Sequence, residues 1–270
     1  MFFHQPDNSI GDDVYNAFVY DDIQWMPHLH KGFELAVVLE GQAQAENDGK
    51  QYVLRQGEAM LVLPYRLHSY ASPTHSKTLV IVFSGNYVSA FSRLVAESDA
   101  ENCSVSFHKE TFDYAMKIFL GRVLSRSDGG QNTWVKYEKP DTLRLKAALY
   151  AVCAEMYPTL KLVKAKRNNS LLYEMITYIE SNYTADISLS SMADALGYDF
   201  RYLSRIFSRT FGVNFKTLVN QYRCDHAKTL IRDSDATLSE IALTSGFQSI
   251  RSFNRVFREI TGDYPSALRR

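Results

Sequence analysis

Four residues near the start of the chain have the types and spacing that could hold a metal ion or a polar ligand. His28, His30 and Glu34 follow one another closely, and His68 comes later. Residues two positions apart in a strand face the same side, so His28 and His30 would point together. Three imidazoles and a carboxylate can coordinate a divalent transition metal with positions left open. The same side chains can also line a ligand pocket or lie in the core as hydrogen-bonded groups.

A second set of residues, late in the chain, has the types that recognise bases in DNA. Arginine can bind guanine through two parallel hydrogen bonds, and asparagine can bind adenine in the same way. Leu203 and Phe207 in one predicted helix, and Phe253 and Phe257 in another, define the buried faces. The opposite faces would then expose Arg201, Ser204, Arg205 and Ser208 in the first helix, and Ile250, Arg251, Asn254, Arg255 and Arg258 in the second.

Each of these helices follows one copy of a repeated pattern. In residues 189–198 and again in residues 238–247, a leucine is followed by an apolar residue, an alanine, a glycine and an aromatic residue at the same spacing. The glycines, Gly197 and Gly246, lie where a helix would end and the backbone would need a positive φ. Thr237 and Glu240 have the spacing of a capping box at the start of the second copy. Helix, glycine-containing turn and helix is the pattern of a helix-turn-helix unit.

The segment between the two units, residues 217–232, predicts a single helix. At 1.5 Å per residue it would span about 24 Å. A rod of that length could hold the two recognition helices about one turn of DNA apart, roughly 34 Å, on one face of the duplex.

Residues 170–270 resemble the DNA-binding domain of the AraC/XylS family of bacterial regulators. The resemblance rests on Glu240-Ile241-Ala242, Gly246-Phe247, Ser249, Phe253, Arg255, Phe257, Gly262 and Pro265. In that family the helices after the two glycines enter successive major grooves of DNA. Asp199, an acid beside the first recognition helix, departs from the family pattern. By position, the resemblance implicates Arg201, Ser204, Arg205, Ile250, Arg251 and Arg255 in DNA binding, and helix geometry adds Asn254.

The first part of the chain predicts short strands separated by turn residues, which is typical of a barrel or sandwich. The strands are expected at residues 33–41, 51–54, 59–63 and 78–83, with the first ending at Gly41. His28, His30, Glu34 and Gly41, followed by Gly57, Pro64 and His68, resemble the two motifs of the cupin barrel. AraC-like regulators commonly carry such a barrel as a sensor, so the resemblance implies an N-terminal effector-binding domain.

Under this sensor interpretation, aromatic and hydrogen-bonding side chains together suit a sugar or another small polar metabolite, and family analogy makes a sugar the leading candidate. We expect no cofactor, no bound metal and no catalysis. The alternative is a metal-dependent cupin enzyme, or a metal sensor fused to a DNA-binding domain, with His28, His30, Glu34 and His68 as ligands. The predicted effector-binding residues are Trp25, His28, His30, Glu34, Arg66, His68 and Tyr70.

Two amphipathic helices are predicted between these parts, one with a stripe from Phe112 to Val123 and one with a stripe from Leu145 to Met156, separated by a break at residues 128–132. Their stripes are either core or part of a subunit contact, and we expect a homodimer. The predicted fold class is α+β multidomain: a cupin-like jelly-roll barrel with dimerisation helices in residues 1–160, a linker in residues 161–169, and an all-α DNA-binding domain in residues 170–270.

The overall charge is neutral, with 30 Lys and Arg against 30 Asp and Glu, so charge alone does not indicate DNA binding. Residues 1–165 carry 16 basic against 19 acidic residues, and residues 166–270 carry 14 against 11, so the C-terminal part is weakly cationic. We expect no signal peptide and no membrane-spanning segment, and the three dispersed cysteines suit a reducing cytoplasm. The expected partners are double-stranded DNA and a small-molecule effector, with RNA polymerase as a further candidate; activation or repression stays open.

Overall fold

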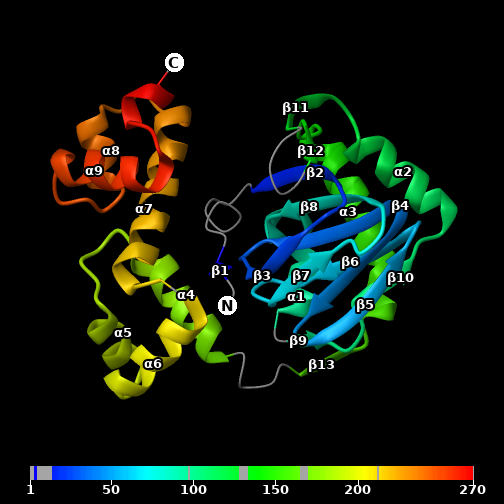
Figure 1. Cartoon of the computed structure of the whole chain (residues 1–270), viewed down its shortest axis with the longest axis horizontal. Coiled ribbons are helices and arrows are strands. Elements are labelled where there is room, and N and C mark those ends of the chain that lie inside the picture. Colours follow the sequence, from blue (N-terminus) through cyan, green and yellow to red (C-terminus); the bar gives the residue numbers. More distant parts are fainter. Residues whose placement is uncertain are drawn as a thin grey trace. The chain divides into compact units, whose positions relative to one another are not determined.

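The computed structural model describes residues 3–4, 14–96, 98–127, 133–164, 170–211 and 213–269. The chain divides into two compact units, an N-terminal unit of residues 2–166 and a C-terminal unit of residues 167–270 (Figure 1). The predicted linker spans this division, and its residues 165–169 lie outside the described part of the chain.

The N-terminal unit is built on a curled, largely antiparallel sheet (Figure 1). β5 (Lys50–Arg55) and β6 (Glu58–Val62) both pair with β4, β10 (Ser104–Ser106) pairs with β6, and β9 (Ser98–Ala100) pairs separately with β13 (Leu162–Lys164). The order along the main path is β1 (Phe3–His4), β3 (Trp25–Leu29), β7 (His68–Ala71), β4 (Phe33–Asn47), β8 (Ser76–Phe83), β2 (Tyr15–Asp21), β12 (Thr133–Tyr137) and β11 (Val123–Ser127).

Strand β4 continues through Gly41 to Asn47, so the predicted end of this strand at Gly41 was wrong. The first part of β4 pairs with β6 and β8, and the last part pairs with β5 and β7. Gly41 has a φ of +72°, and a Cβ at this position would lie 2.1 Å from the carbonyl oxygen of His75. Glycine here therefore allows the strand to bend between two sets of partners instead of stopping it.

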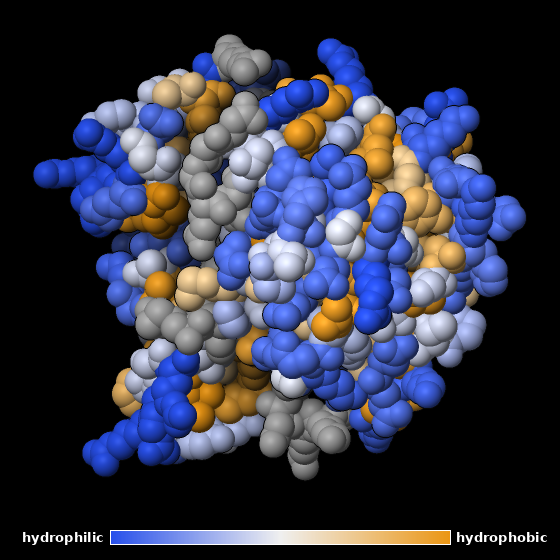
Figure 2. Space-filling view, turned by 45° about the vertical axis from the view of Figure 1, so that its right-hand side comes forward, coloured by the Kyte–Doolittle hydropathy of each residue, from blue (hydrophilic) through white to orange (hydrophobic). Residues whose placement is uncertain are grey.

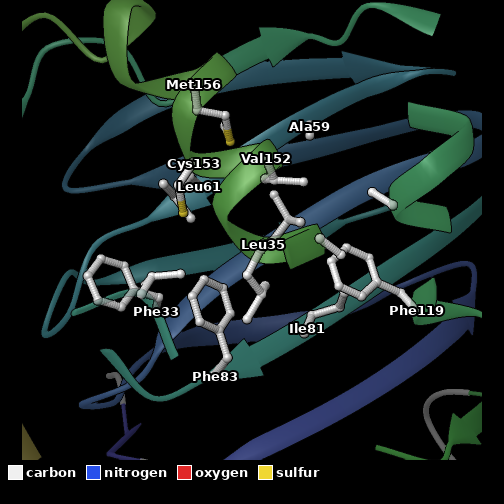
Figure 3. Close-up of a cluster of buried hydrophobic side chains, with 14 of the residues drawn as sticks. Phe33, Leu35, Ala59, Leu61, Ile81, Phe83, Phe119, Val152, Cys153 and Met156 are labelled. Atoms are coloured by element: carbon white, nitrogen blue, oxygen red, sulfur yellow. The ribbon is translucent and has the colours of Figure 1, made fainter. Parts of the chain in front are cut away.

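Alternating side chains bury both faces of the sheet. Leu35 and Phe83 belong to a cluster that packs against three helices, α1 (Ser89–Val95), α2 (Lys109–Phe119) and α3 (Thr142–Met156) (Figure 3). Ala36 and Val38 belong to a second cluster on the opposite face. Glu34 shares the strand parity of Ala36, so the chain places a carboxylate on the face away from the helices. On the surface seen in Figure 2, hydrophilic side chains predominate and hydrophobic ones form small separate patches.

The two predicted helices correspond to α2 and α3, whose stripes face the core. Met116 and Phe119 of α2 and Leu145 and Met156 of α3 belong to the cluster under the helices. Val123 was wrongly assigned to the first helix, because α2 ends at Phe119 and Val123 begins β11. The β11–β12 hairpin extends the sheet by pairing with β2 and was not predicted; the expected break at residues 128–132 lies outside the described residues.

The C-terminal unit is helical. It consists of α4 (Ser170–Asn182), α5 (Leu189–Leu196), α6 (Phe200–Phe211), α7 (Phe215–Asp233), α8 (Leu238–Thr244), α9 (Ile250–Thr261) and the short 3-10 helix η5 (Pro265–Leu268). α7 contains 19 residues and so spans about 28 Å, slightly longer than predicted. Together with the curled sheet, this unit confirms the predicted α+β two-domain arrangement. No helix among the described residues is long and apolar enough to cross a membrane.

Candidate functional site

Helices α5 and α6 form the first helix-turn-helix unit. Ser188 caps α5 by accepting from the backbone N–H of Ser191, and the Ser191 hydroxyl contacts the Ser188 N–H in return. Gly197 ends α5 with a φ of +72°, as the sequence predicted. Asp199 accepts from the backbone N–H of Tyr202 at 3.0 Å, so its carboxylate caps the recognition helix α6. The acid that departs from the family pattern therefore stabilises the N-terminus of this helix.

Helices α8 and α9 form the second unit. Thr237 and Glu240 make the predicted capping box: Thr237 accepts from the Glu240 N–H, and Glu240 accepts from the Thr237 N–H at 2.7 Å. Gly246 adopts a φ of +88°, which confirms the second predicted turn. Ser249 caps α9 through the backbone N–H of Ser252. The cap lies two positions after the glycine in the first unit and three positions after it in the second, so the second turn is longer.

Most of the predicted DNA-binding residues lie on exposed faces. In α6, Arg201 and Arg205 are exposed and Ser204 is half-buried, while Leu203 and Phe207 are buried. In α9, Ile250, Arg251 and Arg255 are exposed and Asn254 is half-buried.

Charged neighbours of these residues were not singled out from sequence. α6 carries three arginines and no acid, and its third arginine, Arg209, is exposed. The Arg255 guanidinium contacts the carboxylate of Glu259 at 2.8 Å, one turn along the helix. The sequence signal for that pair was an acid four residues after the arginine.

The four residues of the N-terminal motif come together. His28 lies on β3 and is paired across the sheet with His68 on β7, while Glu34 lies on β4. Their potential ligand atoms, with one from His30, all lie within 4.8 Å of one another, and all four residues are buried. Glu34 accepts a hydrogen bond from the Tyr70 hydroxyl at 2.5 Å, contacts His30 Nε2 at 3.1 Å and lies 3.3 Å from His68 Nε2.

Backbone carbonyls orient all three imidazoles. The Nδ1 atoms of His28, His30 and His68 lie 2.9, 3.1 and 2.8 Å from the carbonyl oxygens of Met26, Gly32 and Arg66, respectively. An Nδ1–H that donates to a carbonyl leaves Nε2 for another partner, which is the arrangement found in metal-binding histidines. His68 Nε2 is buried and makes no hydrogen bond of acceptable geometry.

Burial and neighbouring groups set the charges of this cluster. Burial, reinforced by His68, lowers the pKa of His28 to about 3, and burial also lowers the pKa of His30. Burial alone would raise the pKa of Glu34, but the imidazoles of His68 and His30 hold that pKa well below its usual range. Burial alone would lower the pKa of His68, but the Glu34 carboxylate raises it. The cluster therefore combines a carboxylate with two neutral imidazoles.

The remaining predicted effector-binding residues divide into two groups. Tyr70 is buried and hydrogen-bonded to Glu34, and the half-buried Trp25 ring lies 5.8 Å from that of His28, so both belong to the cluster. Arg66 contributes its carbonyl to His68, but its guanidinium pairs with Asp99 at 2.5 Å and lies 3.7 Å from Asp48. The carbonyls that orient the imidazoles were not predicted, although each lies only two residues from its histidine along the chain.

Family models match both units. Residues 20–173 match the AraC-like ligand binding domain, and residues 192–270 match a helix-turn-helix domain. An uncharacterized HTH-type transcriptional regulator of Staphylococcus aureus (strain MSSA476) is 34% identical over 102 residues, or 38% of this chain and 14% of that protein. The uncharacterized HTH-type transcriptional regulator YijO of Escherichia coli (strain K12) is 31% identical over 134 residues, or 49% of this chain and 47% of that protein. The matched part is thus less than half the length of either relative.

Solved structures with similar folds include ToxT of Vibrio cholerae strain SCE256, in a variant form without ligand. It is 14% identical with a TM-score of 0.48, over 96% of this chain and 97% of that one. The C-terminal domain of AraT, a response regulator from Geobacillus stearothermophilus, is 26% identical with a TM-score of 0.36, over 37% of this chain and 83% of that one. The first family model alone covers more than half of the chain. The chain therefore belongs to the AraC family of transcriptional regulators.

Proposed function

We propose that this chain is a sequence-specific DNA-binding transcription regulator controlled by a small molecule that binds in the N-terminal unit. The observation that carries the proposal is the pair of capped recognition helices, each of which exposes arginine at the matched positions Arg205 and Arg255. We propose that the exposed faces of α6 and α9 contact the bases and the sugar-phosphate backbone of DNA. We propose that the protein acts in the cytoplasm, and we propose no catalytic activity for it.

DNA binding is tested with the full chain and a pool of random duplexes, from which a preferred site is selected. Replacing Arg205 or Arg255 by alanine should then weaken binding to that site by about 1–3 kcal/mol and relax the preference at one base. Arg93→Ala is the matched control, because Arg93 is an exposed arginine on α1 of the other unit. Failure to select any preferred sequence would overturn the proposal.

For the effector, we propose a small polar metabolite, with a sugar as the first class to test. Hydrogen-bonding groups and an aromatic ring lie together at Glu34, Tyr70 and Trp25, which suits hydroxyl groups on a compact ring. Trp134→Phe leaves Trp25 as the single tryptophan of the chain, so its fluorescence reports on this cluster. A saturable change in this fluorescence with one monosaccharide of a panel supports the proposal if the Tyr70→Phe variant shows no fluorescence change with the same sugar. If no sugar changes the fluorescence of the parent, the effector is not a sugar.

We also propose that two chains form a homodimer through the outer faces of α2 and α3, with RNA polymerase as a further partner on DNA. The apolar stripes of both helices are used in the core, so a subunit contact must use other side chains. Tyr114 on α2 and Leu143 on α3 are large, apolar and exposed, Leu143 by 81%. Sedimentation velocity should show a dimer that Leu143→Glu dissociates; a monomer at all concentrations contradicts this contact.

A second candidate function is a metal-responsive regulator, and the convergence of four buried residues that can bind a metal favours it. The donor set of imidazoles and one carboxylate fits Zn²⁺ or another first-row divalent ion. His28, His30, Glu34 and His68 would hold the ion, which would supply a fixed positive charge between the strands β3, β4 and β7. The Nε2 atom of His68, which is buried beside Glu34 without a hydrogen bond of good geometry, supports the fit.

The metal candidate is tested by elemental analysis of the purified full chain and by titration with Zn²⁺ and Co²⁺. Stoichiometric metal that is lost in His28→Ala and His68→Ala, but kept in His75→Ala, would support it. His75 is a suitable control because it is an exposed histidine of the same unit. Equal metal content in all three variants would reject it.

A further inference from the structure

The turn of the second helix-turn-helix unit packs directly against the loop that leads into the first. This loop, residues 183–188, joins α4 to the capped start of α5, and its residues 183–185 make the contacts described below. A Cβ on Gly246 would lie 2.6 Å from the Cα of Thr184 and 2.7 Å from its carbonyl oxygen. The two backbones therefore touch at Gly246 and Thr184, with no room for a side chain between them.

Arg223, on the connecting helix α7, holds the same loop from another direction. Its Nε donates to the carbonyl oxygen of Tyr183 at 2.6 Å, and its Nη2 donates to that of Ala185 at 2.8 Å. Its guanidinium carbon lies 5.9 Å from the ring centroid of Phe247, the residue that follows Gly246. One planar guanidinium thus contacts the loop of the first unit and the turn of the second.

Aromatic contacts with α7 also hold the loop. The Tyr183 ring lies 5.9 Å from that of Tyr222 and 5.7 Å, edge on, from that of His226, both on α7. The Tyr222 hydroxyl also donates to Glu180 on α4 at 3.3 Å. The loop is therefore held by side chains of α7, Arg223 among them, and by the second turn.

We propose that Arg223 is a positioning residue that sets the separation and angle of the two recognition helices, and with them the spacing between the two DNA subsites that the protein accepts. This inference rests on the proposed function, because it concerns the same two helices. The contact at the loop thus adds a second connection between the two units to the one that α7 provides. Arg223 donates to backbone carbonyls of its own chain, so its role does not require contact with a phosphate.

The first experiment needs no DNA. Cysteines for spin labels replace two exposed residues, Ser208 on α6 and Glu259 on α9, in the full chain; the native cysteines are buried. Arg223→Lys keeps the charge but loses the planar fork that reaches two carbonyls. The label-to-label distance distribution should be narrow in the parent and clearly broader in Arg223→Lys, while Arg144→Lys, an exposed control, should leave it unchanged. An equally narrow distribution in Arg223→Lys overturns the proposal.

The second experiment measures the spacing preference on DNA. The parent should bind the selected site at least about tenfold more tightly than sites with one base pair added or removed between the subsites. This factor corresponds to the loss of one good base contact, because a changed spacing prevents both helices from reaching their bases at once. Arg223→Lys should reduce that ratio several-fold. A uniform loss of affinity at all spacings contradicts the positioning role and indicates a phosphate contact. If no DNA binds at all, the proposed function fails, whereas the spin-label widths still decide the role of Arg223.

Discussion

Replacing Gly246 by alanine should destabilise the C-terminal unit more than the same change at Gly197, its counterpart in the first helix-turn-helix unit. Both glycines have positive φ, +88° and +72°, so both substitutions force alanine into the left-handed region. That strain costs about 1–2 kcal/mol, partly offset by the loss of freedom in the unfolded chain. The surroundings differ: among the described residues, no atom beyond the immediate chain neighbours lies within 4 Å of a Cβ at Gly197, whereas one at Gly246 meets the backbone of Thr184.

The size of the difference follows from this contact. Displacing packed backbone typically costs about 1–3 kcal/mol, so Gly246→Ala should lose that much more stability than Gly197→Ala. A difference of that size corresponds to exchange about 5- to 150-fold faster for amides that open with the unit. Thr184→Ala should not rescue Gly246→Ala, because the close atoms belong to the backbone of Thr184 and not to its side chain.

Hydrogen exchange followed by mass spectrometry measures this in the full chain, from peptides that cover α4 to α9. Hydrogen exchange is measured separately for each peptide, so unfolding of the N-terminal unit does not affect the values for the C-terminal unit. Equal losses of protection in the two variants would refute the close approach of the second turn to Thr184. Rescue by Thr184→Ala would show that the side chain of Thr184, and not its backbone, forms the contact.

Two further predictions concern other positions. Gly41→Ala should sharply lower the melting temperature of the N-terminal unit, measured by tryptophan fluorescence, because the new Cβ meets the His75 carbonyl. Gly49→Ala, at a φ of +81° but with open space around the Cβ, should lower the melting temperature far less. Similar losses in the two variants would contradict the bend in β4. Hydrogen bonds from Thr237 lower the pKa of Glu240, so the unfolded chain takes up this proton at a higher pH than the folded one. The stabilisation is present above the usual glutamate pKa and is lost as the pH falls through the folded value. Protection factors of α8 amides should therefore drop in acid, and Glu240→Gln should remove that dependence; an unchanged dependence in this variant rules out Glu240 as its source.

The helix-turn-helix units could be predicted from the sequence because their signals are local. Apolar spacing defines the buried faces of α6 and α9, and glycine marks the positive φ at Gly197 and Gly246. The capping box at Thr237 and Glu240 was predicted by its residue types, but the one at Ser188 was missed because serine replaces the usual acid at its third helical position. The loop contact of Arg223 was also missed, since a carbonyl partner leaves no trace in sequence.

The N-terminal site was only partly predictable, because its geometry depends on strand pairing. The types of His28 and Glu34 were informative, but their convergence with His68 requires the pairing of β3 with β7, far apart in sequence. The sequence did not show that Asp99, more than thirty positions away, binds the guanidinium of Arg66, a residue predicted to contact the effector. Local signals likewise favoured a strand end at Gly41, where tertiary pairing instead makes a bend.

The most direct test of the central claim is a footprint of the full chain on its selected DNA site, compared among the parent, Arg205→Ala and Arg255→Ala. Two capped recognition helices joined by α7 predict two protected subsites about one helical turn apart, roughly 34 Å. Arg205→Ala should lose protection at one subsite and Arg255→Ala at the other. Loss at the same subsite in both variants, or equal weakening across the whole site, would contradict the assignment of α6 and α9 as separate recognition helices.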